Sequence, residues 1–159
     1  MSTVLGLKAI ELAKSAVGVR EQPLGSNDGP EVKKYLSSVN LPVGNPWCQA
    51  FAFYQFQNAA HQLGLSSLDY PKTGSTTVVG QWAKANGKII TNPVPGCIFL
   101  VPKPNVPGEF HHVGLVSDVL PDGTFISIEG NSNSGGSPEG VGVFSNRRRR
   151  LNLVFALIS

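Results

Sequence analysis

The sequence predicts an α+β fold in which N-terminal helices pack on a C-terminal antiparallel β-sheet of about five strands. Apolar residues recur at helical spacing in the first half of the chain, whereas the second half consists of short β-rich runs divided by turn residues. Helices followed by strands are typical of α+β proteins. With 159 residues, 41% of them hydrophobic, the chain can bury a core. No repeat or linker divides it, so residues 1–159 are expected to form a single domain.

Four segments of the first half are predicted to be helices: residues 3–17, 31–39, 47–63 and 75–85. The first carries one apolar stripe and ends at Gly18. The second follows Pro30, a residue suited to the first helical turn. In residues 47–63 the aromatic side chains surround the helix axis instead of marking one face, which predicts a helix buried on all sides.

Five runs of the second half are predicted to be strands: residues 97–101, 112–117, 124–129, 141–144 and 151–158. Turn residues separate these runs, notably Pro-Asp-Gly at residues 121–123 and the pair Gly135-Gly136. Strands grouped in this way, after the helices, favour an antiparallel sheet.

The distribution of charge argues against nucleic-acid binding and against a membrane segment. The net charge is +3, and the dense basic cluster is the arginine run at residues 147–150. We interpret this run as a solvated strand or loop edge, with weak attraction to an anionic polymer as the alternative. No aromatic residues are interleaved with it, so nucleic-acid binding is not expected. Lys8, Glu11 and Lys14 interrupt the N-terminal apolar residues, so we expect synthesis in the cytoplasm with no signal peptide and no membrane insertion.

The chain has two cysteines, which are too few for a disulfide framework. Cys48 opens the predicted buried helix, where unpaired backbone N–H groups would stabilise a thiolate. This position favours a nucleophile, and a buried structural cysteine is the alternative. Cys97 lies in an apolar strand and is expected to be structural.

A nucleophilic cysteine needs a base nearby, and three histidines are available. His61 lies on the same predicted helix, about 20 Å from Cys48, and is expected at the surface. His111 and His112 are adjacent in a predicted strand, so they point to opposite faces. His112 shares its face with Gly114, which would leave room for the helix, and we therefore predict that His112 is the base.

The base in turn needs a group that orients it. If Leu120 pairs with Gly123 in the turn, His112 lies opposite Asn131 and diagonal to Glu129. Either side chain could then accept a hydrogen bond from the imidazole. A bulge at Gly123 would change this register. For Glu129, a solvated strand end is the alternative interpretation.

Three segments together resemble a known family. They are NPWCQAF at residues 45–51, HVGLV at residues 112–116 and IEGN at residues 128–131. Their order and spacing resemble those of the cysteine, histidine-dependent amidohydrolase/peptidase (CHAP) family of papain-like cell-wall hydrolases. The resemblance spans most of the chain, and it implies a papain-like form of the predicted fold.

The resemblance implies hydrolysis of amide bonds in bacterial peptidoglycan, by an N-acetylmuramoyl-L-alanine amidase or an endopeptidase. It implies Cys48 as nucleophile, His112 as general base, Glu129 as its orienter and Asn131 as an auxiliary polar residue. No cofactor or metal is expected, because members that bind calcium carry acidic residues before the nucleophile and residues 41–47 contain none. We expect a monomer that is released or delivered to the cell wall, as a phage endolysin or an antibacterial effector.

Two other kinds of function stay open on the sequence. An acyltransferase or a deamidase on the same scaffold could use an identical triad. A non-catalytic wall-binding module would usually have lost one of the polar positions, and here none is lost. Zinc and glycosidase sites are disfavoured, because the chain has no Cys-x-x-Cys or His-x-x-x-His spacing and Glu129 has no evident carboxylate partner.

Overall fold

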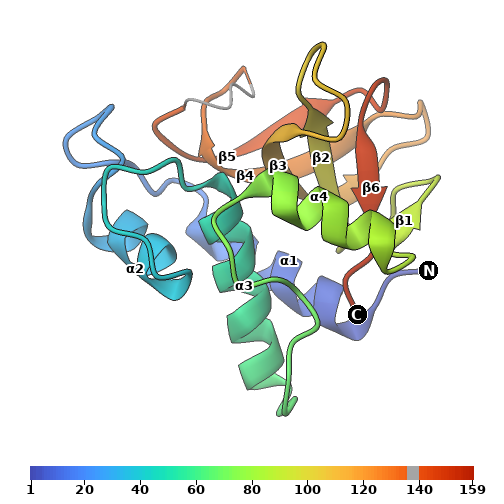
Figure 1. Cartoon of the computed structure of the whole chain (residues 1–159), viewed down its shortest axis with the longest axis horizontal. Coiled ribbons are helices and arrows are strands. Elements are labelled where there is room, and N and C mark those ends of the chain that lie inside the picture. Colours follow the sequence, from blue (N-terminus) through green and yellow to red (C-terminus); the bar gives the residue numbers. More distant parts are fainter. Residues whose placement is uncertain (136–139) are drawn as a thin grey trace.

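The computed structural model describes residues 1–135 and 140–159 and has the predicted α+β architecture (Figure 1). The helices precede the strands, and they are α1 (Val4–Ala16), α2 (Pro30–Ser38), α3 (Cys48–Gln62) and α4 (Thr76–Ala85). Each helix begins and ends within one residue of its predicted bounds. None of the helices in these two ranges has the length and apolar character that crossing a bilayer requires.

The strands form one antiparallel sheet with the order β1-β6-β2-β3-β4-β5. They are β1 (Ile89–Ile90), β2 (Ile98–Pro102), β3 (Phe110–Val119), β4 (Phe125–Ser132), β5 (Gly142–Arg148) and β6 (Val154–Ala156). The prediction of about five strands missed β1, because two residues are too few to show an alternating pattern. The predicted turn at residues 121–123 joins β3 to β4, whereas Gly136 of the other predicted turn lies outside the described residues.

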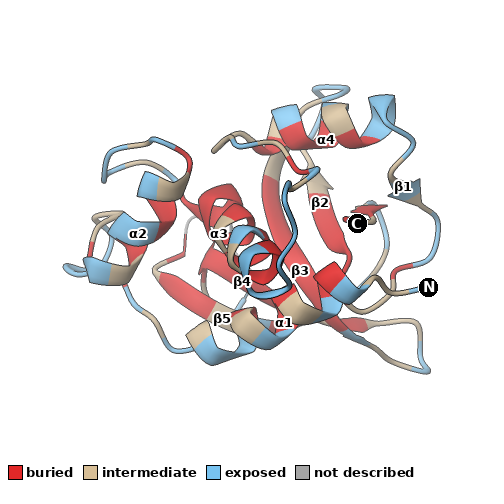
Figure 2. Ribbon diagram, turned by 90° about the horizontal axis from the view of Figure 1, so that it is seen from below, coloured by how far each residue is buried: buried red, intermediate tan, exposed pale blue. Residues whose placement is uncertain are grey.

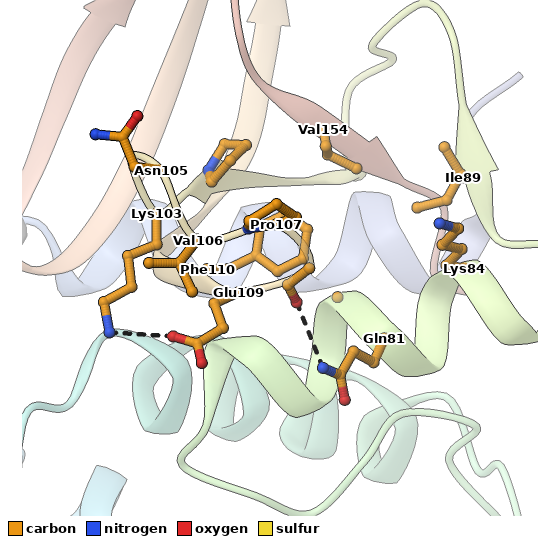
Figure 3. Close-up of a pocket in the computed structure, with 13 residues that line it drawn as sticks. Gln81, Lys84, Ile89, Lys103, Asn105, Val106, Pro107, Glu109, Phe110 and Val154 are labelled. Atoms are coloured by element: carbon orange, nitrogen blue, oxygen red, sulfur yellow. Dashed lines mark hydrogen bonds and ion pairs between the residues drawn. The ribbon is translucent and has the colours of Figure 1, made fainter.

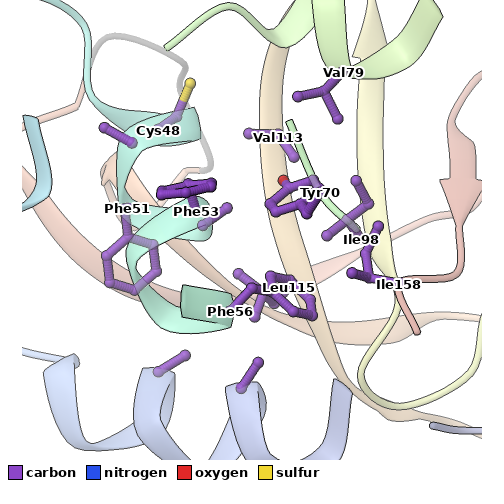
Figure 4. Close-up of a cluster of buried hydrophobic side chains, with 14 of the residues drawn as sticks. Cys48, Phe51, Phe53, Phe56, Tyr70, Val79, Ile98, Val113, Leu115 and Ile158 are labelled. Atoms are coloured by element: carbon purple, nitrogen blue, oxygen red, sulfur yellow. The ribbon is translucent and has the colours of Figure 1, made fainter. Parts of the chain in front are cut away.

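Helix α3 lies at the centre of the fold, where it packs against α1 and α2 and against β3 and β4 (Figure 2). Its N-terminal two-thirds is buried around most of the helix axis, as predicted, and contributes to the larger apolar cluster shown in Figure 4. Full burial of each large apolar side chain in such a core contributes about 1.5–3 kcal/mol. A second apolar cluster lies on the opposite face of the sheet and consists of Cys97, Phe99, Val116, Phe125 and Phe155.

The hairpin between β3 and β4 decides which residues of the two strands face each other. The Leu120 N–H donates to the Thr124 carbonyl (2.9 Å), and the Gly123 N–H donates to the Leu120 carbonyl (3.1 Å). Leu120 therefore pairs with Thr124 and not with Gly123, so the turn is one residue longer than predicted. Gly123 has a φ of +85°, the left-handed conformation with which three-residue hairpin loops commonly end.

A β-bulge between Val116 and Asp118 removes this one-residue offset. Beyond the bulge, Leu115 pairs with Ile128, which is the register that the sequence predicts. The two deviations cancel because the turn adds a residue on the β4 side and the bulge adds one on the β3 side. The pairs beyond the bulge, Val116 with Ser127 and Leu115 with Ile128, are therefore the predicted ones.

Helix α4 holds the start of β3 in place. The hydroxyls of Thr76 and Thr77 donate to the Phe110 carbonyl (2.8 and 3.1 Å), and the Phe110 N–H donates to the Thr77 hydroxyl (3.0 Å). A Cβ at Gly80 would lie 2.3 Å from the Phe110 ring, so this glycine lets the helix approach the strand. His112 follows two residues later, and its backbone position is fixed by these contacts.

Candidate active site

Cys48 is the first residue of α3, as predicted, and Trp47 precedes it as the N-cap residue. The N–H groups of a first helical turn have no carbonyl partner within the helix, and they carry partial positive charge. Cys48 is 5% exposed, and its Sγ points away from the apolar cluster beneath it (Figure 4). The thiol therefore lies at the edge of the core, beside the N–H groups of the first turn of α3.

Trp47, the residue before Cys48, is anchored by a contact that no sequence pattern predicts. The Trp47 Nε1–H donates to Glu21 Oε1 (2.9 Å), and Glu21 Oε2 accepts from the Gly25 N–H (2.8 Å). Trp47 also stacks on Tyr35, with ring centroids 5.7 Å apart. Glu21 and Trp47 are both buried. Because Trp47 directly precedes Cys48, these contacts fix the point at which α3 begins.

His112 and Glu129 form a buried pair. The distance from His112 Nε2 to Glu129 Oε1 is 2.7 Å, and the two side chains are 1% and 0% exposed. The contact is the diagonal one that the register predicts, and Glu129 is not a solvated strand end. Because Nε2 faces the carboxylate, Nδ1 is the ring nitrogen left for a nucleophile. This Nδ1 is buried and has no hydrogen-bond partner among the described residues.

His112 does not lie on the face of β3 that packs on α3, so the physical reason for preferring it to His111 is wrong. Val113 and Leu115 belong to the apolar cluster that contains α3. Successive residues of a strand point to opposite faces, so His112 and Gly114 belong to the other face. His112 is brought to the pair with the carboxylate by the strand register and not by a helix resting on Gly114.

The two glycines of the motifs make room for different neighbours. A Cβ at Gly114 would lie 2.5 Å from the Phe99 ring and 2.8 Å from Glu129 Cγ, so Gly114 admits the ring and the carboxylate side chain. The close approach of α3 occurs at Gly130 of β4, where a Cβ would lie 2.5 Å from Phe51. The predicted space for the helix therefore exists, but on the neighbouring strand.

Hydrogen-bond donors surround the Glu129 carboxylate. Besides His112 they are the Ser127 hydroxyl (2.5 Å), the Ser132 hydroxyl (3.2 Å), the Asn146 amide (3.4 Å) and the Arg148 guanidinium (2.6 and 2.7 Å). Burial alone would raise the pKa of Glu129, but Arg148 and His112 outweigh burial and hold this pKa well below its usual range. Glu129 is therefore an anion at neutral pH.

The same surroundings favour a protonated imidazole. Burial alone would lower the pKa of His112, but the proximity of Cys48 and the hydrogen bond to the Glu129 anion raise that pKa to about 9. Glu129 takes one ring nitrogen and Cys48 interacts with the same ring. A histidine in this position can take the thiol proton and hold it at neutral pH.

The arginine run at residues 147–150 has two different sides. Arg147 pairs with Asp122 and is 59% exposed, which agrees with a solvated edge. Arg148 points the other way, is 18% exposed and binds Glu129. The interpretation of the run as a solvated edge or as a patch for an anionic polymer is therefore wrong for Arg148.

The other predicted residues lie as follows. Asn131 is 3% exposed and has a φ of +53°, a left-handed conformation that asparagine adopts more readily than most residues. Cys97 is buried, as expected of a structural thiol, and burial raises its pKa to about 11. His61 is exposed near the end of α3, as predicted, and His111 is half-buried. Neither Cys97 nor His61 is part of the arrangement around Glu129.

A hollow of about 680 Å³ lies between α4, β6 and the loop at residues 103–109 (Figure 3). Its walls are mostly apolar, and Phe110, Ile89 and Val154 contribute to them. None of the predicted site residues lines it, so it is separate from the Cys48 region. Within the described ranges, no group of three or more His, Cys, Asp or Glu side chains is placed to hold a metal ion.

Cys48 should react with iodoacetamide at least about tenfold faster than Cys97 at neutral pH, because the thiolate is the reactive form of cysteine. Cys48 lies at a helix N-terminus beside the His112 imidazolium, whereas burial holds the pKa of Cys97 near 11. Peptide mapping after timed alkylation of the folded protein measures both rates, and His112→Ala should slow the labelling of Cys48. Equal labelling of the two cysteines would show that Cys48 is not activated.

Comparison with known proteins was made for the whole chain. A family model described as the CHAP domain matches residues 40–131, which is more than half of the chain. The matched segment contains Cys48, His112, Glu129 and Asn131, and it ends before β5. No curated protein matches the chain.

Proposed function

Because this chain belongs to the CHAP domain family, as its motifs predict, we propose that it hydrolyses amide bonds of bacterial peptidoglycan with Cys48, His112 and Glu129 as a catalytic triad. Domains of this family are generally cysteine- and histidine-dependent amidohydrolases, and their substrate is peptidoglycan. The observation that supports the proposal best is the buried 2.7 Å contact between His112 and Glu129. The proximity of Cys48 also raises the pKa of this histidine. The proposed activity is that of an N-acetylmuramoyl-L-alanine amidase or an endopeptidase.

In the proposed reaction, Cys48 passes its proton to His112 and the Sγ attacks the amide carbon of the substrate. A tetrahedral intermediate forms, and its oxyanion lies near the unpaired N–H groups at the start of α3. His112 then gives the proton to the leaving amine as the C–N bond breaks, and a thioester remains on Cys48. Water, activated by His112, hydrolyses the thioester and restores the thiol.

Glu129 has an orienting role in this proposal and does not take the proton from His112. Its pKa lies well below the usual range, so the shared proton stays on the imidazole. By binding Nε2, the carboxylate turns Nδ1 toward the nucleophile. We assign Asn131 an auxiliary role near the imidazole, because it is buried near the end of the strand that carries Glu129.

The proposal treats residues 1–159 as one catalytic domain that works as a monomer. A single domain is favoured because β5, which follows the matched segment, pairs with β4 and supplies Arg148 to Glu129. The monomeric state stays a prediction. Delivery to the wall, as an endolysin or an antibacterial effector, is part of the proposal.

Mass spectrometry of muropeptides after digestion of purified cell walls tests the proposed function. We expect the turbidity of the wall suspension to fall and soluble fragments to appear whose masses identify one cleaved amide bond. A folded protein that leaves walls intact but transfers an acyl group or deamidates another substrate would favour an acyltransferase or a deamidase. Wall binding without cleavage would favour a non-catalytic module.

Glu129→Gln should lower kcat/KM for wall hydrolysis by about tenfold to a hundredfold, less than the loss of the nucleophile, because the orienting anion is lost while the other groups stay. Turbidity assays of the purified variant measure this effect. Asp122→Asn is the matched control, since it removes the exposed carboxylate that pairs with Arg147 and should leave the rate unchanged. An unaffected rate in Glu129→Gln would move the orienting role to Asn131.

A further inference from the structure

We propose that Arg148 is a positioning residue that fixes the Glu129 carboxylate and, through it, the orientation and charge of His112. The inference rests on the proposed function and adds a fourth group to the three proposed there. Arg148 belongs to β5, beyond the segment that the family model matches. Its position inside an arginine run conceals this role in the sequence.

Arg148 binds both oxygens of the carboxylate. Its Nε–H donates to Glu129 Oε2 (2.6 Å), and its Nη2–H donates to Glu129 Oε1 (2.7 Å). The oxygen Oε1 is also the one that lies 2.7 Å from His112 Nε2. Such a bidentate contact fixes the plane of the carboxylate as well as its distance from the guanidinium. The plane of Glu129, in turn, sets the direction from which His112 is bound.

Arg148 is itself held by the second apolar cluster. Its guanidinium carbon lies 4.9 Å from the centroid of the Phe99 ring, which suits a planar cation stacked on an aromatic face. The ring of Phe99 also contacts His112, with centroids 6.3 Å apart. Gly114 leaves the space into which Phe99 and Glu129 fit. The Phe99 ring therefore contacts both Arg148 and His112, the two groups that bind the Glu129 carboxylate.

The charge of Arg148 also limits how strongly Glu129 attracts the imidazolium. The titratable groups around His112 are Cys48 on α3, Glu129 on β4 and the half-buried His111, and Arg148 on β5 acts on it through Glu129. Removing the Arg148 cation would leave the Glu129 anion facing His112 alone. The protonated imidazole would then be favoured more strongly, and the proton would be harder to pass to a leaving group.

Titration of the three histidines by NMR, together with kcat and KM for wall hydrolysis, tests the inference. In Arg148→Ala we expect the pKa of His112 to rise by about one pH unit, because a nearby cation is lost. We expect kcat to fall about tenfold with KM unchanged, because the substrate does not contact Arg148 in this proposal. The titrations of His61 and His111 should stay within error and serve as internal references.

Two further variants separate charge from geometry. Arg148→Lys keeps the cation but cannot bind both oxygens, so we expect a nearly unchanged pKa of His112 and a reduced kcat. Arg147→Ala is the matched control from the same strand, since its guanidinium pairs with exposed Asp122, and it should change neither quantity. If Arg148→Ala does not fold, Arg148→Lys decides, and a wild-type kcat in that variant overturns the inference.

The failure of this inference can be told from the failure of the proposed function. If Arg148→Ala matches Arg147→Ala in both the pKa of His112 and kcat, Arg148 has no positioning role even though the wall is hydrolysed. If the wild-type protein does not hydrolyse walls, the proposed function fails. The NMR titration still decides in that case, because an unchanged pKa of His112 in Arg148→Ala overturns the inference without any substrate.

Discussion

Replacing Cys48 by alanine should lower the rate of peptidoglycan hydrolysis by at least about a thousandfold and leave the fold intact. The sulfur is the atom that would attack the amide carbon, and loss of a triad nucleophile typically costs several orders of magnitude in rate. The change removes one atom from a side chain at the edge of the core, so the thermal unfolding midpoint should change little. Turbidity loss of cell walls measures the rate, and circular dichroism measures the unfolding.

The chain offers a matched control for this experiment, because Cys97 is also a buried cysteine. Cys97→Ala makes the same chemical change in the second apolar cluster, away from Glu129. It should cost about 1 kcal/mol of stability through the small cavity and should keep most of the activity. A Cys48→Ala protein that retains more than about a tenth of the activity would exclude Cys48 as the nucleophile.

His112→Ala should be nearly as severe as Cys48→Ala, whereas His111→Ala should change the rate by no more than about twofold. His112 contacts Glu129 and interacts with Cys48, and both the acylation and the hydrolysis steps of the proposed reaction depend on proton transfer by His112. The Glu129 anion stays paired with Arg148 in this variant, so the protein should fold. Turbidity assays at saturating wall concentration compare the two variants directly. A larger loss in His111→Ala would contradict the assignment of the base.

The pH profile gives a second readout of His112. Its pKa is raised to about 9, so the proton that it must give to the leaving amine is present at neutral pH and is lost as the pH rises through about 9. The wild-type rate should therefore fall as the pH rises through about 9, which gives the pH–rate profile an alkaline limb. Any residual activity of His112→Ala should lack the limb.

The elements of the fold follow from local patterns, and this is why the sequence predicts them well. A helix such as α3, with aromatic residues on all sides, is recognisable from about four turns of chain. Strands β2 to β5 are long enough to be recognised, although β3, β4 and β5 extend two to four residues beyond their predicted bounds. Strand β1 has two residues, and its pairing with β6 comes from tertiary packing that leaves no periodic signal.

The register between β3 and β4 is the predicted one only beyond the bulge, because the turn is one residue longer than predicted. Nothing in residues 121–123 distinguishes a two-residue from a three-residue loop, since glycine suits both. No sequence pattern predicts the bulge after Val116 either, and this bulge restores the pairing of Leu115 with Ile128. The contact of His112 with Glu129 depends on both deviations together.

The supports of the candidate site could not be predicted from sequence, because they join residues from distant elements. Glu21 and Trp47 are 26 residues apart, and Glu129 and Arg148 are 19 apart, with no shared motif. An arginine within a run of four is ordinarily solvated, so composition pointed away from Arg148. The residues proposed as catalytic, Cys48, His112 and Glu129, could be selected from the sequence because each lies in a short motif of its own.

The bond between Glu21 and Trp47 implies that the segment by which this family is recognised is smaller than the unit that can function. A fragment cut at residues 40 and 131 would keep every residue proposed to touch the substrate. It would also leave the buried Trp47 indole N–H, next to Cys48, without its acceptor, at a cost of about 1–3 kcal/mol. The same cut would remove Arg148, which binds both oxygens of the Glu129 carboxylate. The functional unit therefore extends to the residues that support the proposed catalytic groups. Exchange of residues 1–39 or 132–159 with those of a relative would change the rate of the proposed reaction although Cys48, His112 and Glu129 stay the same.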